Sequence, residues 1–199
     1  VAIPSSLLSS AVGQLADVRR AVTMDFKEAG NRIFLIGSTK NELGGSHYAF
    51  VNGLSGGEVP QVDLELAPRI FRAVHGSIVS GCVRSCHDLS EGGLAAAVSE
   101  MAFGGELGAN LSLRALSKSS GINDDAVLLF SESNTRFLVE VPAARRDEFV
   151  QSFADLPCVE LGMVVPGPNL RIVNGPGQTI IDAPWTELKQ AWQKPLAWE

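Results

Sequence analysis

One stretch near the middle of the chain constrains the fold more than any other. An apolar run, residues 78–83, leads into the letters S-C-H-D-L-S-E-G-G, and a helix-like run, residues 94–103, leads out of them. The polar stretch contains a carboxylate, Asp88, a hydroxyl, Ser90, and two adjacent glycines. An apolar strand, a glycine-containing turn and an amphipathic helix in this order predict a strand–loop–helix unit.

This unit has two interpretations. In the first, Gly92 and Gly93 let the backbone approach an anion, because the first N–H groups of a helix and its dipole favour negative charge. A hard cation such as magnesium could then bind the Asp88 carboxylate and phosphate oxygens at the same time. In the second, Asp88 and Ser90 are ordinary helix N-caps. The sequence leaves both open, and His87 is either a ligand or a hydrogen-bonding residue at the helix entry.

A second polar loop with paired glycines occurs earlier in the chain. Residues 32–37 form a buried strand by their apolar character, and residues 38–47 follow as a polar loop that contains Gly44, Gly45 and Ser46. The backbone N–H groups of this loop could cradle a phosphate. The structural alternative is a tight turn where a helix packs closely on the sheet.

The two loops, in this order, identify a resemblance. The motifs N-E-L-G-G-S at 41–46 and H-D-L-S-E-G-G-L at 87–94 resemble those of phosphoribosylformylglycinamidine synthase, in the C-terminal part of its synthetase chain. The resemblance covers nearly the whole chain. Further segments that fit the family are residues 21–27, 130–133, 136–141 and 187–192.

The resemblance implies an α/β (α+β) domain, the smaller C-terminal type of the aminoimidazole-ribonucleotide-synthetase-like superfamily. It implies an ATP-dependent ligase of purine biosynthesis with ATP/ADP and Mg²⁺ as cofactors. Asp88 matches the motif's magnesium ligand and Ser90 a phosphate contact, with Gly92, Gly93, Gly44, Gly45 and Ser46 beside the nucleotide. Residues 132–134 match a region that lies near substrate in the sibling domain, or are only a hairpin loop.

The resemblance also implies partners. The larger ATP-binding domains of the same synthase chain would supply the catalytic histidine and further metal carboxylates, and a glutaminase subunit or domain would supply ammonia. The chain alone is then expected to be inactive and to self-associate through residues 1–26, where neighbouring domains normally cover apolar surface. The alternative function is a non-catalytic assembly module whose Asp88 motif is only structural.

The composition argues against some classes of protein. The net charge of −6, with scattered Lys and Arg, argues against a nucleic-acid binder. No apolar run approaches the ~20 residues of a membrane span. The three cysteines are typical of reduced thiols in a cytoplasmic protein. We expect residues 1–16 to be a linker or leading strand from a preceding domain and residues 17–199 to be the domain itself.

The pattern of elements predicts a mixed β-sheet with packed helices. We expect a strand edge at 18–22, a short helix or turn at 46–54, a helix capped by Asp63 up to about residue 79, and turn residues at Asp124 and Asp125. The other predicted strands are 33–37, 83–86, 111–113, 126–130, 136–141, 159–164, 170–173 and 179–181, with residues 131–135 as a hairpin loop. The other predicted helices are 90–103, 143–154 and 185–192.

Overall fold

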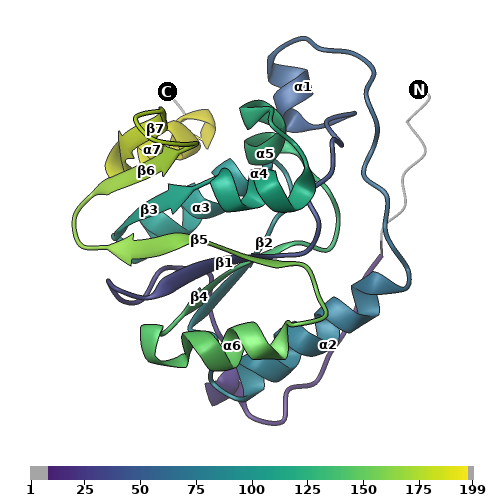
Figure 1. The fold of residues 1–199 in the computed structure, drawn as a ribbon, viewed down its shortest axis with the longest axis vertical. Helices are drawn as coiled ribbons and strands as arrows, with labels where there is room; N and C mark the ends of the chain where they lie inside the picture. The colour runs from purple at the N-terminus through teal and green to yellow at the C-terminus, as the bar shows by residue number, and fades with distance from the viewer. Residues whose placement is uncertain (1–8, 197–199) are drawn as a thin grey trace.

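The computed structural model describes residues 9–196 (Figure 1). No helix within these residues has the length and apolar character needed to cross a membrane. The strands are β1 (Arg32–Ile36), β2 (Ser85–Asp88), β3 (Gly108–Ser112), β4 (Phe137–Val141), β5 (Cys158–Val165), β6 (Asn169–Val173) and β7 (Thr179–Pro184). The α-helices are α1 (His47–Val51), α2 (Leu66–Val79), α3 (Gly93–Gly105), α4 (Arg114–Ser120), α5 (Asp125–Phe130), α6 (Arg146–Ser152) and α7 (Trp185–Gln193). Short 3-10 turns occupy Val18–Arg20, Ala143–Arg145 and Lys194–Leu196.

All seven strands form one sheet in the order β2-β4-β1-β5-β3-β6-β7. The pair β3–β6 is parallel, and the other neighbouring pairs are antiparallel. The expected mixed sheet with packed helices is therefore confirmed. Strand β2, which carries Asp88, is at one edge of this sheet and pairs with β4 through Asp88↔Phe137 at its end.

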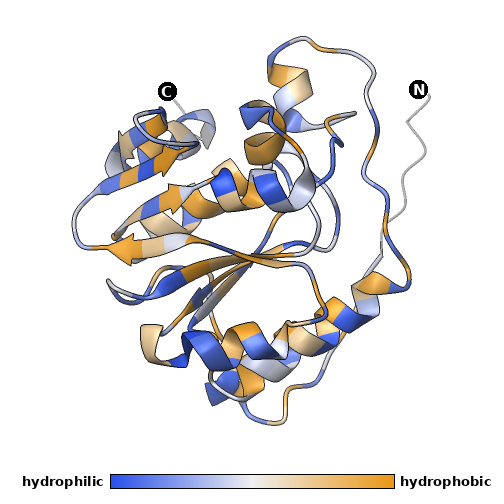
Figure 2. Cartoon of the chain, viewed as in Figure 1, coloured by the Kyte–Doolittle hydropathy of each residue, from blue (hydrophilic) through white to orange (hydrophobic). Residues whose placement is uncertain are grey.

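Helices cover both faces of the sheet (Figure 1). On one face, α3, α4, α5 and α7 enclose an apolar core around Leu94, Val98 and Met101 of α3. On the other face, α2 and α6 enclose a second core that includes Phe34, Ile70 and Phe149. Alternate residues of β1 belong to the two cores, Ile33 and Leu35 to the first and Phe34 and Ile36 to the second, and much of the sheet is coloured as hydrophobic in Figure 2. The sheet is thus a rigid support that fixes the ends of β2 and β4 relative to α2 and α3.

Several predicted elements differ from the structure. Residues 126–130, expected as a strand, belong to helix α5, so residues 131–135 connect a helix to β4 and are not a hairpin loop. Asp124 is the N-cap of that helix rather than a turn residue. Residues 18–20 form a 3-10 turn instead of a strand edge. Helix α4 was not expected, and β2 begins two residues later than predicted.

The segment before β1 is attached to the sheet by one buried carboxylate. Glu140 of β4 is fully buried and accepts the backbone N–H groups of Lys27 and Glu28, the amide of Asn31 at 2.6 Å and the hydroxyl of Ser85. These four hydrogen bonds offset the cost of burying the charge. Residues 9–16 contain no helix or strand, and the rest of the segment predicted as a linker or leading strand, residues 1–8, lies outside the described residues.

Candidate functional site

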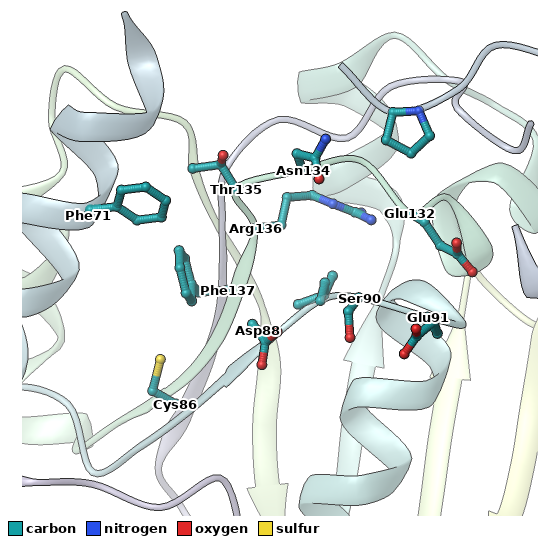
Figure 3. Close-up of a pocket in the computed structure, with 12 residues that line it drawn as sticks. Phe71, Cys86, Asp88, Ser90, Glu91, Glu132, Asn134, Thr135, Arg136 and Phe137 are labelled. Carbon is teal, nitrogen blue, oxygen red and sulfur yellow. The ribbon is translucent and has the colours of Figure 1, made fainter. Parts of the chain in front are cut away.

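A cleft of about 760 Å³ opens where β2 ends and β4 begins (Figure 3). One wall is the end of β2 and the loop that follows it, and the opposite wall is the loop that leads into β4. Phe71 of α2 and Pro60 also line the cleft. The remaining lining residues are Cys86, Asp88, Leu89, Ser90, Glu91, Glu132, Asn134, Thr135, Arg136 and Phe137.

Asp88 is the last residue of β2, and its side chain is 69% exposed at this cleft. Among the described residues, the basic side chain within 4 Å of it is that of His87, whose Nδ1 lies 3.4 Å from Oδ1. The N-cap of α3 is Gly92, and no side chain caps this helix. The N-cap interpretation of Asp88 is therefore wrong, because the strand ends four residues before the helix cap.

His87 has a structural partner on the helix. Its Nε2 lies 2.7 Å from Oε2 of Glu100 in α3, and the His87 side chain is only 14% exposed. This contact ties β2 to α3 and agrees with the interpretation of His87 as a hydrogen-bonding residue. Asp88, the next residue along the strand and the last of β2, stays accessible with its side chain 69% exposed.

Ser90 and the two glycines after it form the turn from β2 into α3. Ser90 is exposed at the cleft, and its carbonyl accepts the N–H of Gly93 at 3.1 Å. Gly93 has a φ of +60°, and a Cβ there would lie 2.4 Å from the carbonyl oxygen of Ser131. Glycine is needed here because the helix start packs directly on the loop before β4.

Glu132 joins the two glycine loops. Its Oε1 accepts the N–H of Gly92 and the N–H of His47, both at 2.9 Å, and lies 3.7 Å from Nδ1 of His47. One carboxylate thus accepts N–H groups at the starts of both α1 and α3, where a helix favours negative charge. The sequence indicated the two loops but not this link, which depends on residues 40 and 85 positions apart.

The earlier glycine loop has structural contacts of its own. The N–H of Gly44 donates to the carbonyl of Glu58 at 2.8 Å, and a Cβ on Gly44 would lie 2.5 Å from the carbonyl oxygen of Gly57. Ser46 is the N-cap of α1 and accepts the N–H of Ala49 at 3.1 Å. Gly45 adopts a φ of +73°. These contacts match the tight-turn alternative, and phosphate contact by Gly44, Gly45 and Ser46 stays a prediction.

The electrostatics of the cleft are set by three carboxylates and one buried cation. Asp88, Glu91 and Glu132 line the cleft together with Arg136, which is almost fully buried. The guanidinium of Arg136 donates to the carbonyls of Ser131 and Ser133 and to the hydroxyl of Thr39. Burial lowers the pKa of Arg136 to about 10. The group stays charged at neutral pH and rigidifies the loop that carries Glu132.

The pKa of the Cys86 thiol depends on burial and on one of these carboxylates. Burial, and to a smaller extent the nearby charge of Asp88, raise the pKa of its thiol to about 11. A thiol with this pKa is almost entirely protonated at neutral pH. Cys86 is therefore a poor nucleophile, as expected for a reduced structural cysteine.

The donor set fits a magnesium–nucleotide only in part. The exposed oxygens of Asp88 are the hard ligands that Mg²⁺ prefers, and the Ser90 hydroxyl nearby can donate to a phosphate oxygen. Within residues 9–196, no group of three or more His, Cys, Asp and Glu side chains is placed to hold a metal ion. Asp88 would thus be one ligand of a site that other residues or phosphates complete.

The chain is similar in sequence to a described protein family and to curated proteins. Residues 28–174 match the family described as "AIR synthase related protein, C-terminal domain". The chain is 37% identical over 190 residues to phosphoribosylformylglycinamidine synthase subunit PurL of Caldanaerobacter subterraneus subsp. tengcongensis, covering 94% of this chain and 25% of that protein. The chain thus spans about a quarter of the length of the curated relatives it matches.

Solved structures share the fold. T. maritima PurL complexed with FGAR aligns with a TM-score of 0.75 at 20% identity, over 86% of this chain and 30% of that chain. T. maritima PurL complexed with ATP aligns with a TM-score of 0.70 at 20% identity, over 86% of this chain and 27% of that chain. At this identity, the structural match supports the arrangement of the sheet and helices.

Proposed function

The chain belongs to the AIR synthase related proteins as their C-terminal domain, and we propose that it is this domain of a phosphoribosylformylglycinamidine synthase. The whole enzyme would be an ATP-dependent ligase that converts formylglycinamide ribonucleotide to its amidine. The sequence relatives are synthase subunits, and a neighbouring structure is a complex with ATP. These comparisons favour the ligase over a stand-alone assembly module.

The observation that carries the proposal is the position of Asp88. This carboxylate lies at the end of an edge strand, is 69% exposed at a cleft and does not cap a helix. Among the described residues its side chain accepts no hydrogen bond, and its only ion-pair contact is with the His87 ring. Bound magnesium–ATP supplies the phosphoryl group that activates the amide oxygen of the substrate. In this role Asp88 holds the metal and neutralises part of its charge.

Other residues would contact the nucleotide or hold the walls of the cleft. The hydroxyl of Ser90 would donate to a phosphate oxygen, and Gly92 and Gly93 form the turn after it, where Gly93 packs directly against the carbonyl of Ser131. Glu132 and Arg136 hold the opposite wall by hydrogen bonds. Gly44, Gly45 and Ser46 come directly before His47, whose N–H donates to Glu132, so we propose that they support this wall or contact the nucleotide.

The remaining parts of the enzyme are proposed from the relatives. Residues 17–199 would be the domain unit. Larger ATP-binding domains of the same polypeptide would complete the metal site, and a glutaminase subunit or domain would deliver ammonia. A purine-synthesis enzyme of this kind would work in the cytoplasm.

The test is an assay of the natural polypeptide that contains these 199 residues. With formylglycinamide ribonucleotide, ATP, Mg²⁺ and ammonia, we expect amidine and ADP to form in equal amounts. The 199-residue chain alone should show no turnover, because the cleft lacks a complete metal site within residues 9–196. A folded natural polypeptide without this activity, or a fully active 199-residue chain, would overturn the proposal.

A further inference from the structure

A second cavity of about 370 Å³ lies at the other end of β2 from Asp88. One side of it is formed by residues 19–23 and Lys27. The other side is formed by residues 78–81, at the end of α2, and by Val83 and Arg84, which lead into β2. None of its lining residues also lines the Asp88 cleft. In Figure 1 the first of these segments is the purple stretch at the bottom of the view, beside α2. This basic pocket is a separate site.

Its lining carries four cationic side chains and no carboxylate. Arg19 pairs with Asp17, and Lys27 pairs with Asp25, and neither acid lines the pocket. The other two cations, Arg20 and Arg84, form no ion pair within residues 9–196. Two guanidinium groups without an ion pair therefore line one cavity, although Asp17, whose pKa is lowered mainly by its hydrogen bonds with Arg19, lies close enough for the charge of Arg20 to lower that pKa as well.

The walls of the basic pocket are fixed by hydrogen bonds. Arg20 donates through Nη1 to the carbonyl of Val79, and Arg145 donates to the carbonyl of Ser80 at 2.9 Å. Across the pocket, the N–H of Cys86 in β2 donates to the carbonyl of Thr23 at 3.1 Å. Arg20 and the backbone around the pocket are thus fixed, which lowers part of the entropy cost of binding a ligand, while the exposed Arg84 side chain is free to close on it.

The pocket also has an apolar side. Val83 is buried and Val22 and Ile78 are half-buried, and all three belong to the apolar layer between α2 and the sheet or pack against it. A cationic rim over an apolar floor suits a ligand with an anionic group attached to a carbon skeleton. Guanidinium groups form their strongest paired hydrogen bonds with phosphate and carboxylate oxygens, and a doubly charged phosphate best balances two of them.

We propose that the basic pocket binds a small phosphate monoester, with the phosphate held between Arg20 and Arg84 and the organic part on the apolar floor. The site is distinct from the proposed nucleotide cleft and needs no magnesium. It also does not depend on the proposed ligase activity, so either proposal can fail without the other.

Phenyl phosphate is a suitable probe, because it combines the two required features. The natural polypeptide that contains this chain is titrated in EDTA, which removes metal-dependent binding at the Asp88 cleft, and affinity is measured by calorimetry. Resonances of residues 19–23 and 78–84 should shift in the NMR spectrum. Arg84→Gln should weaken binding at least ~10-fold, because it removes charge-assisted hydrogen bonds. Arg20→Gln should weaken binding in the same direction.

The control is Arg114→Gln, which removes the same charge from the exposed start of α4, away from both cavities. It should leave the affinity unchanged within about twofold. Arg84 makes no side-chain hydrogen bond within the described residues, so its variant should fold normally, which a thermal melt checks. The proposal is overturned if phenyl phosphate does not bind at ~10 mM. It is also overturned if Arg84→Gln and Arg114→Gln weaken binding equally, or if acetate binds as tightly as the phosphate.

Discussion

At the residue scale, Glu132 is the side chain that joins the two glycine loops beside the cleft. Its carboxylate accepts N–H groups from Gly92 and His47, and its side chain is only 15% exposed. The sequence predicted the two glycine loops separately because each is a local pattern. Their meeting at one carboxylate depends on the fold, and no spacing rule within a single sequence indicates it.

Replacement of Glu132 should therefore be costly. Glu132→Ala leaves two N–H groups unpaired in a half-buried place and should lower the free energy of unfolding by about 1–3 kcal/mol. Glu132→Gln keeps one acceptor oxygen and should cost less. The measurement is urea unfolding followed by circular dichroism. Glu91→Ala, in the same cleft but exposed, is the control and should stay within ~0.5 kcal/mol of the parent. Equal effects of Glu132→Ala and Glu91→Ala would contradict this account.

The thiol of Cys86 offers a chemical probe of the cleft. Since burial raises its pKa to about 11, Cys86 should react with iodoacetamide at pH 8 at least ~10-fold more slowly in the native chain than in urea. Asp88→Asn removes a charge that raises this pKa, so it should speed the native reaction. Peptide mass spectrometry separates Cys86 from the other two cysteines. A native rate equal to the rate in urea, or no change in Asp88→Asn, would show that the assigned surroundings are wrong.

The same pKa predicts how stability depends on pH. The folded-state pKa of Cys86 lies above its ordinary value of 9.0, so its contribution is complete below about pH 9 and is lost as the pH rises through about 11. Cys86→Ala should flatten this part of the curve of unfolding free energy against pH. An unchanged slope between the parent and Cys86→Ala would contradict the shift.

At the element scale, the sequence predicted most strands and helices, but it missed α4 and assigned α5 to a strand. The apolar runs that became β1, β4 and β5 were recognised, as were α2 and α3. Residues 126–130 were assigned to a strand because a short apolar run fits a buried strand and a buried helix equally well. The signal that separates them is Asp124, whose side chain accepts the N–H groups of Ala126 and Val127 as a helix N-cap.

The capping role of Asp124 can be tested directly. Asp124→Ala should lower the free energy of unfolding by about 1 kcal/mol, because it removes the acceptor for two N–H groups at the start of α5. Asp124→Asn retains a capping oxygen and serves as the matched control, with little expected change. Denaturant unfolding of both variants gives the comparison. If alanine and asparagine are equally tolerated, Asp124 does not cap α5.

At the scale of the whole molecule, the mixed sheet could be predicted, but the place of the cleft could not. Alternating strands and helices indicated a sheet with packed helices, and the glycine motifs indicated where a ligand would bind. The strand order, with β2 at an edge and paired with β4, follows from contacts far apart in sequence. That order places the loop before β4 opposite Asp88, and it explains why Glu132 and Arg136 belong to the site.

Exposed apolar residues before β1 form a surface through which the chain could self-associate. Val12, Leu15 and Val18 are largely exposed, and Met24 is partly so. We expect the 199-residue chain to self-associate through this segment in light scattering, and Leu15→Ser with Val18→Ser to reduce the apparent mass. Val150→Ser, an exposed apolar position on α6, is the control and should change nothing. A chain that stays monomeric at high concentration, or an equal effect of Val150→Ser, would contradict this expectation.

The role of Asp88 as a metal ligand in a nucleotide cleft is tested most directly by thermal melts of the natural polypeptide with and without magnesium–ADP. Because Asp88 accepts no helix N–H, Asp88→Asn and Asp88→Ala should both leave the stability without ligand within ~0.5 kcal/mol of the parent. A saturating ligand protects by about 2.7 kcal/mol at 100 times its Kd. Both variants should lose magnesium-dependent protection, while Glu91→Gln keeps it. Full protection of Asp88→Asn by magnesium–ADP would contradict the account.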